Sequence, residues 1–306
     1  MPTYEHLHCA KAAKKDEFYT LTETIEKEFK NYPAKLFYGK TILCPCDDYS
    51  KSNFCKFFIN QFDTLKLKSL ICTCYSGKNA IDLINTEEVR GKFFIKDSTG
   101  VKTGFLKGNG DFRSSEILEL ISNTDYIITN PPFSLFRDFI EVCKNKKYLI
   151  LGNVTAVSYK SIFELFKNRK IFLGQSIKSG DIPFRVPDDY ISDNVKDSVK
   201  YVNVSGIRWF TNIQEKPNKP LELLKAYTPE DFPRYDNYDA IEVSKTNNIP
   251  YDYPGLMGVP ITFMDKFNAE QFRLISVLRR PTLNGKVKFL RIIIQNLKFI
   301  HQQVGL

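Results

Sequence analysis

Short apolar runs alternate with amphipathic segments along the chain up to about residue 174. Apolar runs bounded by polar turns predict buried strands, here over 40–46, 69–74, 125–129, 147–152 and 170–174. Between these runs, apolar side chains recur at helical spacing, as Phe54, Phe57, Phe58 and Phe62 do. Strands that alternate with helices form βαβ units. We therefore expect a doubly wound α/β fold with a mostly parallel, Rossmann-like sheet, and ligands at the carboxyl ends of its strands.

Capping and turn signals predict further elements in the same region. Thr20 and Glu23 form a capping-box pattern, which predicts a helix over 21–30 with Thr20 as its cap. Helices are also expected near 80–84, 114–121, 134–144 and 159–167, and a hairpin around 97–102.

The pattern changes after about residue 212. Residues 217–260 contain seven of the fifteen prolines and show no regular periodicity, which predicts loop-rich structure. A helix over 269–277 and a strand over 289–294 are expected to close the chain. We therefore divide the chain into an α/β domain over 1–213 and a loop-rich segment over 214–306.

Basic residues are concentrated at the C-terminal end. The formal net charge is +9, and no acidic residue follows Glu270. Seven basic residues do follow it, among them Arg279, Arg280, Lys286, Lys288 and Arg291. A one-sided basic segment suits a polyanion such as nucleic acid. The alternative is a solvated surface that acids from elsewhere balance in space.

Composition narrows the class of protein. A chain of 306 residues with 42% hydrophobic and 26% charged residues is globular rather than disordered. No run approaches the ~18 apolar residues that span a membrane, and the N-terminus lacks an apolar signal core. We therefore expect a cytoplasmic protein without membrane contact. The pairs Cys44/Cys46 and Cys72/Cys74 lie in predicted strands, so we interpret them as buried thiols rather than a zinc site.

The strongest candidate for chemistry is Asn130-Pro131-Pro132-Phe133, which directly follows the predicted strand 125–129. The two prolines fix φ and remove two backbone donors, and a residue that precedes a proline is held extended. The side-chain oxygen of Asn130 and the carbonyl of Pro131 can then face one amino group. Phe133 offers a flat surface on which a planar base can stack. The alternative is an ordinary strand-to-helix turn.

This motif and several other segments resemble one enzyme family. TDYIITNPPF (124–133) resembles the catalytic motif of amino-methyltransferases that use S-adenosylmethionine. The EcoRI modification methylase family resembles this chain in the content and order of segments 14–20, 41–54, 69–76, 108–112, 206–212 and 249–272. The resemblance spans at least residues 14–294. It implies an adenine-N6 DNA methyltransferase, with a catalytic domain over 1–213 and a target-recognition segment over 214–306.

The resemblance implies S-adenosylmethionine as the cofactor and no metal. It implies that the turn Asp47-Asp48 holds the methionine part of the cofactor, with a carboxylate near its ammonium group. A surface turn with a helix cap is the alternative. It also implies that Asp111-Phe112 binds the adenine of the cofactor; the alternative is an acid that interacts with a helix dipole.

Two further points concern the cofactor. The resemblance implies that Tyr19 and Thr20 pack against it, and the alternative for Thr20 is a helix cap only. The predicted strand 69–74 ends in Cys74-Tyr75, where methyltransferases usually carry an acidic residue for the cofactor ribose. We therefore assign no ribose ligand.

The chemistry of adenine methylation explains the residue types in the motif. The exocyclic amine of adenine is a poor nucleophile, because its lone pair is delocalised into the ring. Two acceptors, Asn130 and the Pro131 carbonyl, can bind its N–H groups and stabilise the charge that develops. A paired base cannot reach this geometry, so the target adenine is expected to flip out and stack on Phe133.

The expected partner is double-stranded DNA, with phosphate contacts from Arg279, Arg280, Lys286, Lys288 and Arg291. A cognate restriction endonuclease that acts separately is a possible partner. One alternative function is methylation of an RNA base or a protein glutamine amide, because the same motif suits those groups. Another alternative is a catalytically silent DNA-binding protein on the same scaffold.

Overall fold

The computed structural model describes residues 18–77, 89–187, 190, 192, 194–196 and 198–299. The chain forms two compact units. The first unit comprises the chain up to Asn153 together with Gly174–Gln214, and the second comprises Val154–Leu173 together with the chain from Glu215 onward. The boundary that the sequence suggested, 213/214, lies one residue from the last crossing between the units, whereas the excursion of Val154–Leu173 was not expected.

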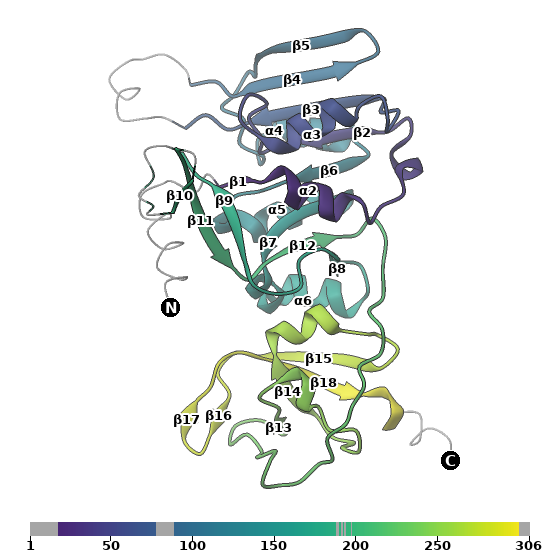
Figure 1. The fold of residues 1–306 in the computed structure, drawn as a ribbon, viewed down its shortest axis with the longest axis vertical. Helices are drawn as coiled ribbons and strands as arrows, with labels where there is room; N and C mark the ends of the chain where they lie inside the picture. The colour runs from purple at the N-terminus through teal and green to yellow at the C-terminus, as the bar shows by residue number, and fades with distance from the viewer. Residues whose placement is uncertain are drawn as a thin grey trace. The chain divides into compact units, whose positions relative to one another are not determined.

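A mixed sheet forms the centre of the first unit, with its strands in the order β5-β4-β3-β2-β6-β7-β12 (Figure 1). The four central strands are parallel neighbours: β3 (Ser69–Cys74), β2 (Thr41–Cys44), β6 (Tyr126–Thr129) and β7 (Lys147–Asn153). The flanking strands are antiparallel: β4 (Lys92–Asp97), β5 (Gly100–Phe105) and β12 (Ile207–Thr211). The predicted parallel pairing is thus limited to the centre. Only Ser98 and Thr99 connect β4 to β5, and so short a connection joins antiparallel strands.

Helices pack on both faces of this sheet. They are α2 (Thr22–Phe29), α3 (Asn53–Gln61), α4 (Ser115–Ser122) and α5 (Phe136–Cys143). Phe58 of α3 shares a core cluster with Ile42 of β2 and Trp209 of β12. Because side chains alternate along a strand, Phe210 faces the opposite side. There its ring contacts Phe136 of α5, with centroids 4.9 Å apart.

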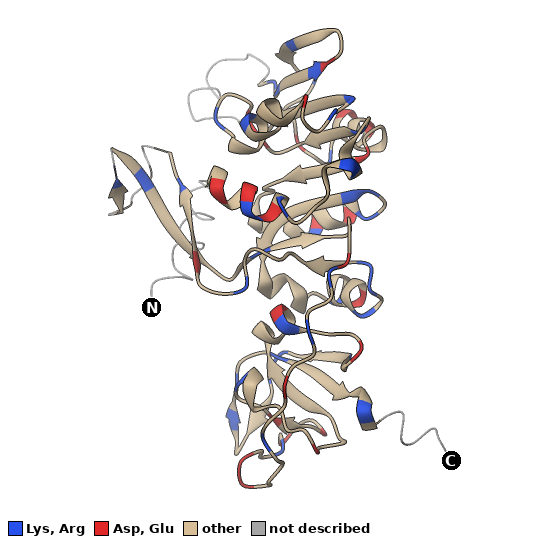
Figure 2. Ribbon diagram, turned by 45° about the vertical axis from the view of Figure 1, so that its right-hand side comes forward, with Lys and Arg blue, Asp and Glu red and all other residues tan. Residues whose placement is uncertain are grey.

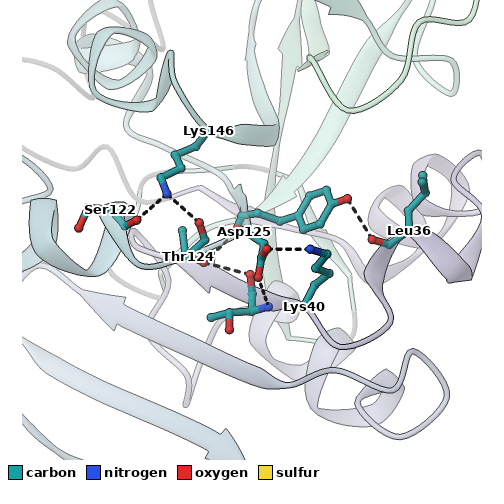
Figure 3. Close-up of polar contacts among 8 residues, drawn as sticks. Leu36, Lys40, Ser122, Thr124, Asp125 and Lys146 are labelled. Carbon is teal, nitrogen blue, oxygen red and sulfur yellow. Dashed lines mark hydrogen bonds and ion pairs between the residues drawn. The ribbon is translucent and has the colours of Figure 1, made fainter.

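Polar contacts at the amino ends of the central strands fix how β6 lies beside β2 (Figure 3). The Asp125 carboxylate accepts hydrogen bonds from Lys40 Nζ (3.0 Å) and from the backbone N–H of Thr41 (2.9 Å). Lys146 Nζ donates to the carbonyl oxygens of Ser122 (2.6 Å) and Thr124 (3.0 Å). These contacts hold the amino ends of the central strands together. The carboxyl ends are left to the loops that follow the strands.

A second sheet of four strands lies in the first unit, in the order β1-β9-β11-β10. Its strands are β1 (Tyr19–Thr20), β9 (Asp181–Arg185), β11 (Val199–Ser205) and β10 (Val195–Lys196). The expected capping role of Thr20 is wrong. Thr20 pairs with Phe184 in β1, and α2 begins two residues later, with Leu21 as an N-cap that makes no side-chain hydrogen bond.

The second unit contains a four-stranded sheet in the order β13-β14-β18-β15 and a two-stranded ribbon, β16-β17. Its elements are α6 (Lys160–Lys167), β8 (Phe172–Leu173), β13 (Ile241–Glu242), β14 (Met257–Pro260), β15 (Phe272–Leu278), β16 (Thr282–Leu283), β17 (Lys286–Val287) and β18 (Arg291–Asn296). The chain also forms short 3-10 helices, η1 (Ala34–Phe37), η2 (Phe133–Leu135), η3 (Val154–Ser158), η4 (Thr246–Asn248) and η5 (Ile261–Lys266).

The helix expected over 269–277 is wrong, because most of this stretch is strand β15. Phe272 and Leu274 are buried, and the residues between and after them pair with β18 across the sheet. Residues 269–271, which favour a helix, lie in the turn before β15, whereas β15 itself contains residue types that favour strands, such as Phe272 and Ile275.

Most other expected elements are confirmed, with shifts of a few residues at their ends. The hairpin is β4-β5, and α4 begins after Ser114, whose Oγ accepts a hydrogen bond from the backbone N–H of Ile117. The helix expected near 80–84 lies outside the described residues. Among the described helices, none combines the length and apolar character that a membrane span requires.

Candidate active site

The carboxyl ends of the parallel strands bring the predicted site residues to one edge of the sheet. Asp47 and Asp48 follow β2, and Asn130 follows its neighbour β6. The loop around Gly110 lies against the end of β3, because Ser76 N–H donates to the Asn109 carbonyl at 2.8 Å. Gly110 has φ +82°, and a Cβ there would lie 2.3 Å from the Cys74 carbonyl oxygen, so this approach requires glycine.

Asn130 has one end of its amide anchored and the other end unpaired. Its Nδ2 donates to the Phe18 carbonyl at 2.7 Å. This bond fixes the orientation of the amide, because only the nitrogen can donate to a carbonyl. Its Oδ1 is buried and has no hydrogen-bond partner among the described residues. A buried acceptor without a partner costs about 1–3 kcal/mol, so the position suits a ligand that supplies an N–H group.

The two prolines and Phe133 continue the chain into α5. Pro131 is buried, Pro132 is half-buried, and Phe133 starts η2. The Phe133 ring stacks on Phe18, with centroids 5.9 Å apart and planes 20° apart, and it meets Phe184 edge-on at 6.1 Å. Phe133 is half-buried, so one face of its ring is held by Phe18 and the ring is partly exposed.

Asp47 is buried and links the end of β2 to the end of β6. Its carboxylate accepts hydrogen bonds from Ser52 Oγ (2.6 Å) and from Thr129 Oγ1, the residue that precedes Asn130. Burial raises the pKa of Asp47 to about 8. Because Ser52 and Thr129 bind one carboxylate oxygen each, both oxygens already have hydroxyl partners. Asp47 thus positions the turn and the end of β6 relative to one another.

Asp48 is half-buried and keeps more of its hydrogen-bonding capacity. Its Oδ1 accepts hydrogen bonds from the backbone N–H (2.9 Å) and the Oγ (2.7 Å) of Ser50. Within the described part of the chain, its Oδ2 has no such partner. Of the two acids in this turn, Asp48 is the better placed to receive an ammonium group.

Asp111 and Phe112 occupy the loop at the end of β3. Arg113 holds the Asp111 carboxylate through Nε (2.9 Å) and NH2 (2.7 Å), and this contact lowers the pKa of Asp111. A carboxylate has about four acceptor positions, so Asp111 can accept a further N–H group. Phe112 is buried edge-on against Phe139, with centroids 5.1 Å apart, and so supports the loop from beneath.

Tyr19 and Thr20 form β1, beside the Phe18 carbonyl that anchors Asn130. Asn53 Nδ2 donates to the Thr20 carbonyl at 2.8 Å and ties β1 to the start of α3. The Thr20 hydroxyl is buried and has no partner among the described residues, as is true of Asn130 Oδ1. Two unpaired polar atoms on neighbouring segments fit a polar ligand such as a nucleoside-containing cofactor, and Thr20, Asp48 and Asp111 would hold it.

The basic residues of the C-terminal segment differ in exposure. Arg279, Arg280 and Lys286 are exposed, Lys288 is half-buried, and Arg279 NH2 donates to the Ser158 carbonyl at 3.1 Å. Arg291 instead forms a buried ion pair with Glu242 at 2.6 Å, with side-chain exposures of 12% and 9%. In Figure 2 the ribbon is blue at Lys and Arg positions on both units and not only at the C-terminal end.

Sequence reasoning missed several residues that shape this site. Phe18 anchors the Asn130 amide and stacks on Phe133, while Ser52 and Thr129 hold Asp47. Arg113 holds Asp111. Only Arg113 carried a local signal, because it lies two residues after the acid that it pairs with.

Comparison with known proteins gives one family across nearly the whole chain. A family model described as "Adenine-specific methyltransferase EcoRI" matches residues 6–302. The Type II methyltransferase M.EcoRI of Escherichia coli is 39% identical over 96% of this chain and 97% of its own. M.MgeORF184P of Mycoplasma genitalium is 37% identical over 95% and 98%, and M.MpnI of Mycoplasma pneumoniae 38% identical over 89% and 85%. No solved structure gives a significant match.

Proposed function

The chain belongs to the EcoRI family of adenine-specific methyltransferases, and on this premise we propose how its residues divide the work of methyl transfer. It is a type II DNA adenine methyltransferase that uses S-adenosylmethionine. Family membership favours DNA over an RNA base or a protein glutamine amide. We propose that the reacting atom is the exocyclic N6 of an adenine flipped out of the duplex.

The observation that carries the catalytic proposal is the unpaired Oδ1 of Asn130, held in place by the Phe18 carbonyl. Asn130 Oδ1 accepts one N–H of the adenine amine, and the Pro131 carbonyl accepts the other. These two bonds stabilise the positive charge that develops on N6 as its lone pair attacks the methyl carbon. Phe133, steadied by Phe18, stacks against the flipped base and aligns the amine. An intact acceptor at this position also argues against a catalytically silent protein.

The cofactor supplies an activated methyl group on a sulfonium. We propose that Asp48 receives its ammonium group and that the Thr20 hydroxyl donates to its carboxylate, with Tyr19 beside them. Asp111, oriented by Arg113, would accept a hydrogen bond from the amine of its adenine, in the loop that Phe112 supports. Asp47 does not contact the cofactor in this proposal, since its oxygens already accept hydrogen bonds from Ser52 and Thr129. It positions the turn that carries Asp48. No metal is part of this proposal.

The proposal extends to architecture. Helices on both faces and a parallel centre support a doubly wound methyltransferase arrangement for the first unit. We assign catalysis to this unit and target recognition to the second. Arg279, Arg280, Lys286 and Lys288 would contact phosphates, whereas Arg291 is left out because Glu242 engages it. We also propose that a separate cognate restriction endonuclease exists and that the enzyme acts on cellular DNA in the cytoplasm.

Transfer of labelled methyl groups tests this function directly. Purified protein is incubated with labelled S-adenosylmethionine and with mixed-sequence duplex DNA, RNA or a glutamine-containing peptide. The DNA is then digested, and its nucleosides are separated. We expect label in N6-methyl-2′-deoxyadenosine from the DNA alone. Label in another nucleoside, or in RNA or peptide but not in DNA, would contradict the proposal.

A further inference from the structure

A cavity of about 280 Å³ in the first unit adjoins the proposed cofactor site through Tyr19, and its cationic residues have no role in the proposed reaction. Three cationic side chains line it, Lys51, Lys56 and Arg185, together with Tyr19 and Ser50. Among its described lining residues there is no carboxylate. Tyr19 and Arg185 are direct cross-strand partners in β1 and β9, so their side chains leave the same face of that sheet.

The three cations have no ion pair or hydrogen bond from their side chains within the described part of the chain. Elsewhere the cations Lys40, Arg113 and Arg169 are each paired with a carboxylate. Like charges that converge on one cavity repel one another unless an anion lies between them. The three lining cations are exposed and reach water, and together they give the cavity a positive lining that suits an anion.

The cavity shares two segments with the active site. Tyr19 follows Phe18, whose carbonyl anchors the Asn130 amide. Ser50 donates both its backbone N–H and its hydroxyl to Asp48, the acid proposed for the cofactor. A base captured at Asn130 stays joined to its sugar and phosphates, so the DNA backbone must pass close to these segments.

We propose that this cavity binds a backbone phosphate of the DNA beside the target adenine, an inference that rests on the proposed function. A phosphodiester is singly negative and has free oxygens for Lys56, Lys51 and Arg185. The carboxylate of the cofactor is the competing anion. The cofactor carries a sulfonium and an ammonium beside that carboxylate, so its net charge is positive and three further cations would repel it. Charge therefore favours the phosphate.

The test neutralises two of the three cations, in the variant Lys56→Ala/Arg185→Ala. Its matched control is Lys35→Ala/Lys68→Ala, which removes the same charge from exposed positions that precede β2 and β3, at the opposite edge of the sheet. Binding of a mixed-sequence duplex is measured across a salt series, and binding of S-adenosylmethionine by calorimetry. For the cavity variant we expect weaker DNA binding and a log–log salt slope flatter by about 0.9 for one lost phosphate contact. Cofactor affinity should stay at the wild-type value, and the control should match wild type in both assays.

Three results would overturn the inference. A cavity variant with the wild-type salt slope and affinity would show that no phosphate binds there. A variant that loses cofactor affinity but keeps its DNA affinity would assign the cavity to the cofactor carboxylate. A wild-type protein that neither binds nor methylates DNA would remove the proposed function and this inference with it, whereas in the first two cases the proposed function stands.

Discussion

Replacement of Asn130 by alanine separates catalysis from stability. In the folded protein the substitution removes one hydrogen bond, from Nδ2 to the Phe18 carbonyl at 2.7 Å. A single bond of this kind contributes about 1 kcal/mol, but the substitution also removes the buried, unpaired Oδ1 and its cost, so the variant should fold with a melting temperature close to that of wild type. Among the described residues the Oδ1 has no partner, so its contribution to binding is felt only when the adenine amine is present. By analogy with oxyanion-hole donors, the single-turnover rate should fall about 10²–10³-fold, or ~2.7–4 kcal/mol.

The matched control is Asn153→Ala, at the carboxyl end of the neighbouring strand β7. Asn153 Nδ2 donates to the Ser205 carbonyl at 3.0 Å, so the control loses a side-chain-to-backbone bond of the same type. Both variants are compared by thermal unfolding, by cofactor calorimetry and by single-turnover methyl transfer at saturating cofactor. We expect similar stability in both and loss of rate in Asn130→Ala alone. Near wild-type turnover in Asn130→Ala, or an equal loss in Asn153→Ala, would refute the assignment.

Further substitutions, at Phe133, Asp111, Asp47 and Arg291, test other parts of the structure. Phe133→Ala should weaken capture of the base by ~1–3 kcal/mol and Phe133→Trp by less, and equal single-turnover rates in wild type and both variants would reduce Phe133 to core packing. Asp111→Ala should raise the dissociation constant of S-adenosylmethionine about tenfold or more, because a hydrogen bond to a charged group contributes about 1.5–3 kcal/mol; unchanged calorimetry would remove it from the site. Burial raises the pKa of Asp47 from 3.8 to about 8, so the folded state should lose stability as pH rises between these values. Asp47→Asn should abolish that slope in denaturant titrations, and an identical slope would contradict the burial argument. Arg291→Ala should destabilise the protein by about 3–5 kcal/mol, because buried Glu242 loses its countercharge and keeps, among the described residues, only the Tyr235 hydroxyl, and the double variant with Glu242→Leu should recover much of the loss.

Features that depend on neighbours in sequence could be predicted from the sequence. The buried strands, the hairpin β4-β5 and the extended Asn130 before two prolines all follow from local pattern and proline sterics. Their meeting at one edge follows from the parallel pairing of β2 with β6. This reasoning reached the candidate motif over 130–133 because the motif directly follows a strand.

Features that depend on distant partners could not be predicted. Thr129 reaches Asp47 across 82 positions, and Glu242 reaches Arg291 across 49, so neither partner is visible from local pattern. Asp47 and Glu242 are acidic residues that look exposed in the sequence, but with these partners they are buried in the fold. Strand β15 was missed for a related reason, because its pairing with β18 is not visible from local pattern.

The excursion of Val154–Leu173 into the second unit limits how this enzyme can be divided. Helix α6 contacts β15, and Lys167 Nζ reaches the Ile275 carbonyl at 3.5 Å, although more than a hundred positions separate them. A fragment that begins at residue 214 would lack α6, whose Ile162, Phe163 and Phe166 are buried. Its sheet would then expose apolar surface. On the proposed assignment of target recognition to the second unit, exchange of a C-terminal segment alone would not transfer specificity, because a working graft has to carry the internal segment 154–173 with it.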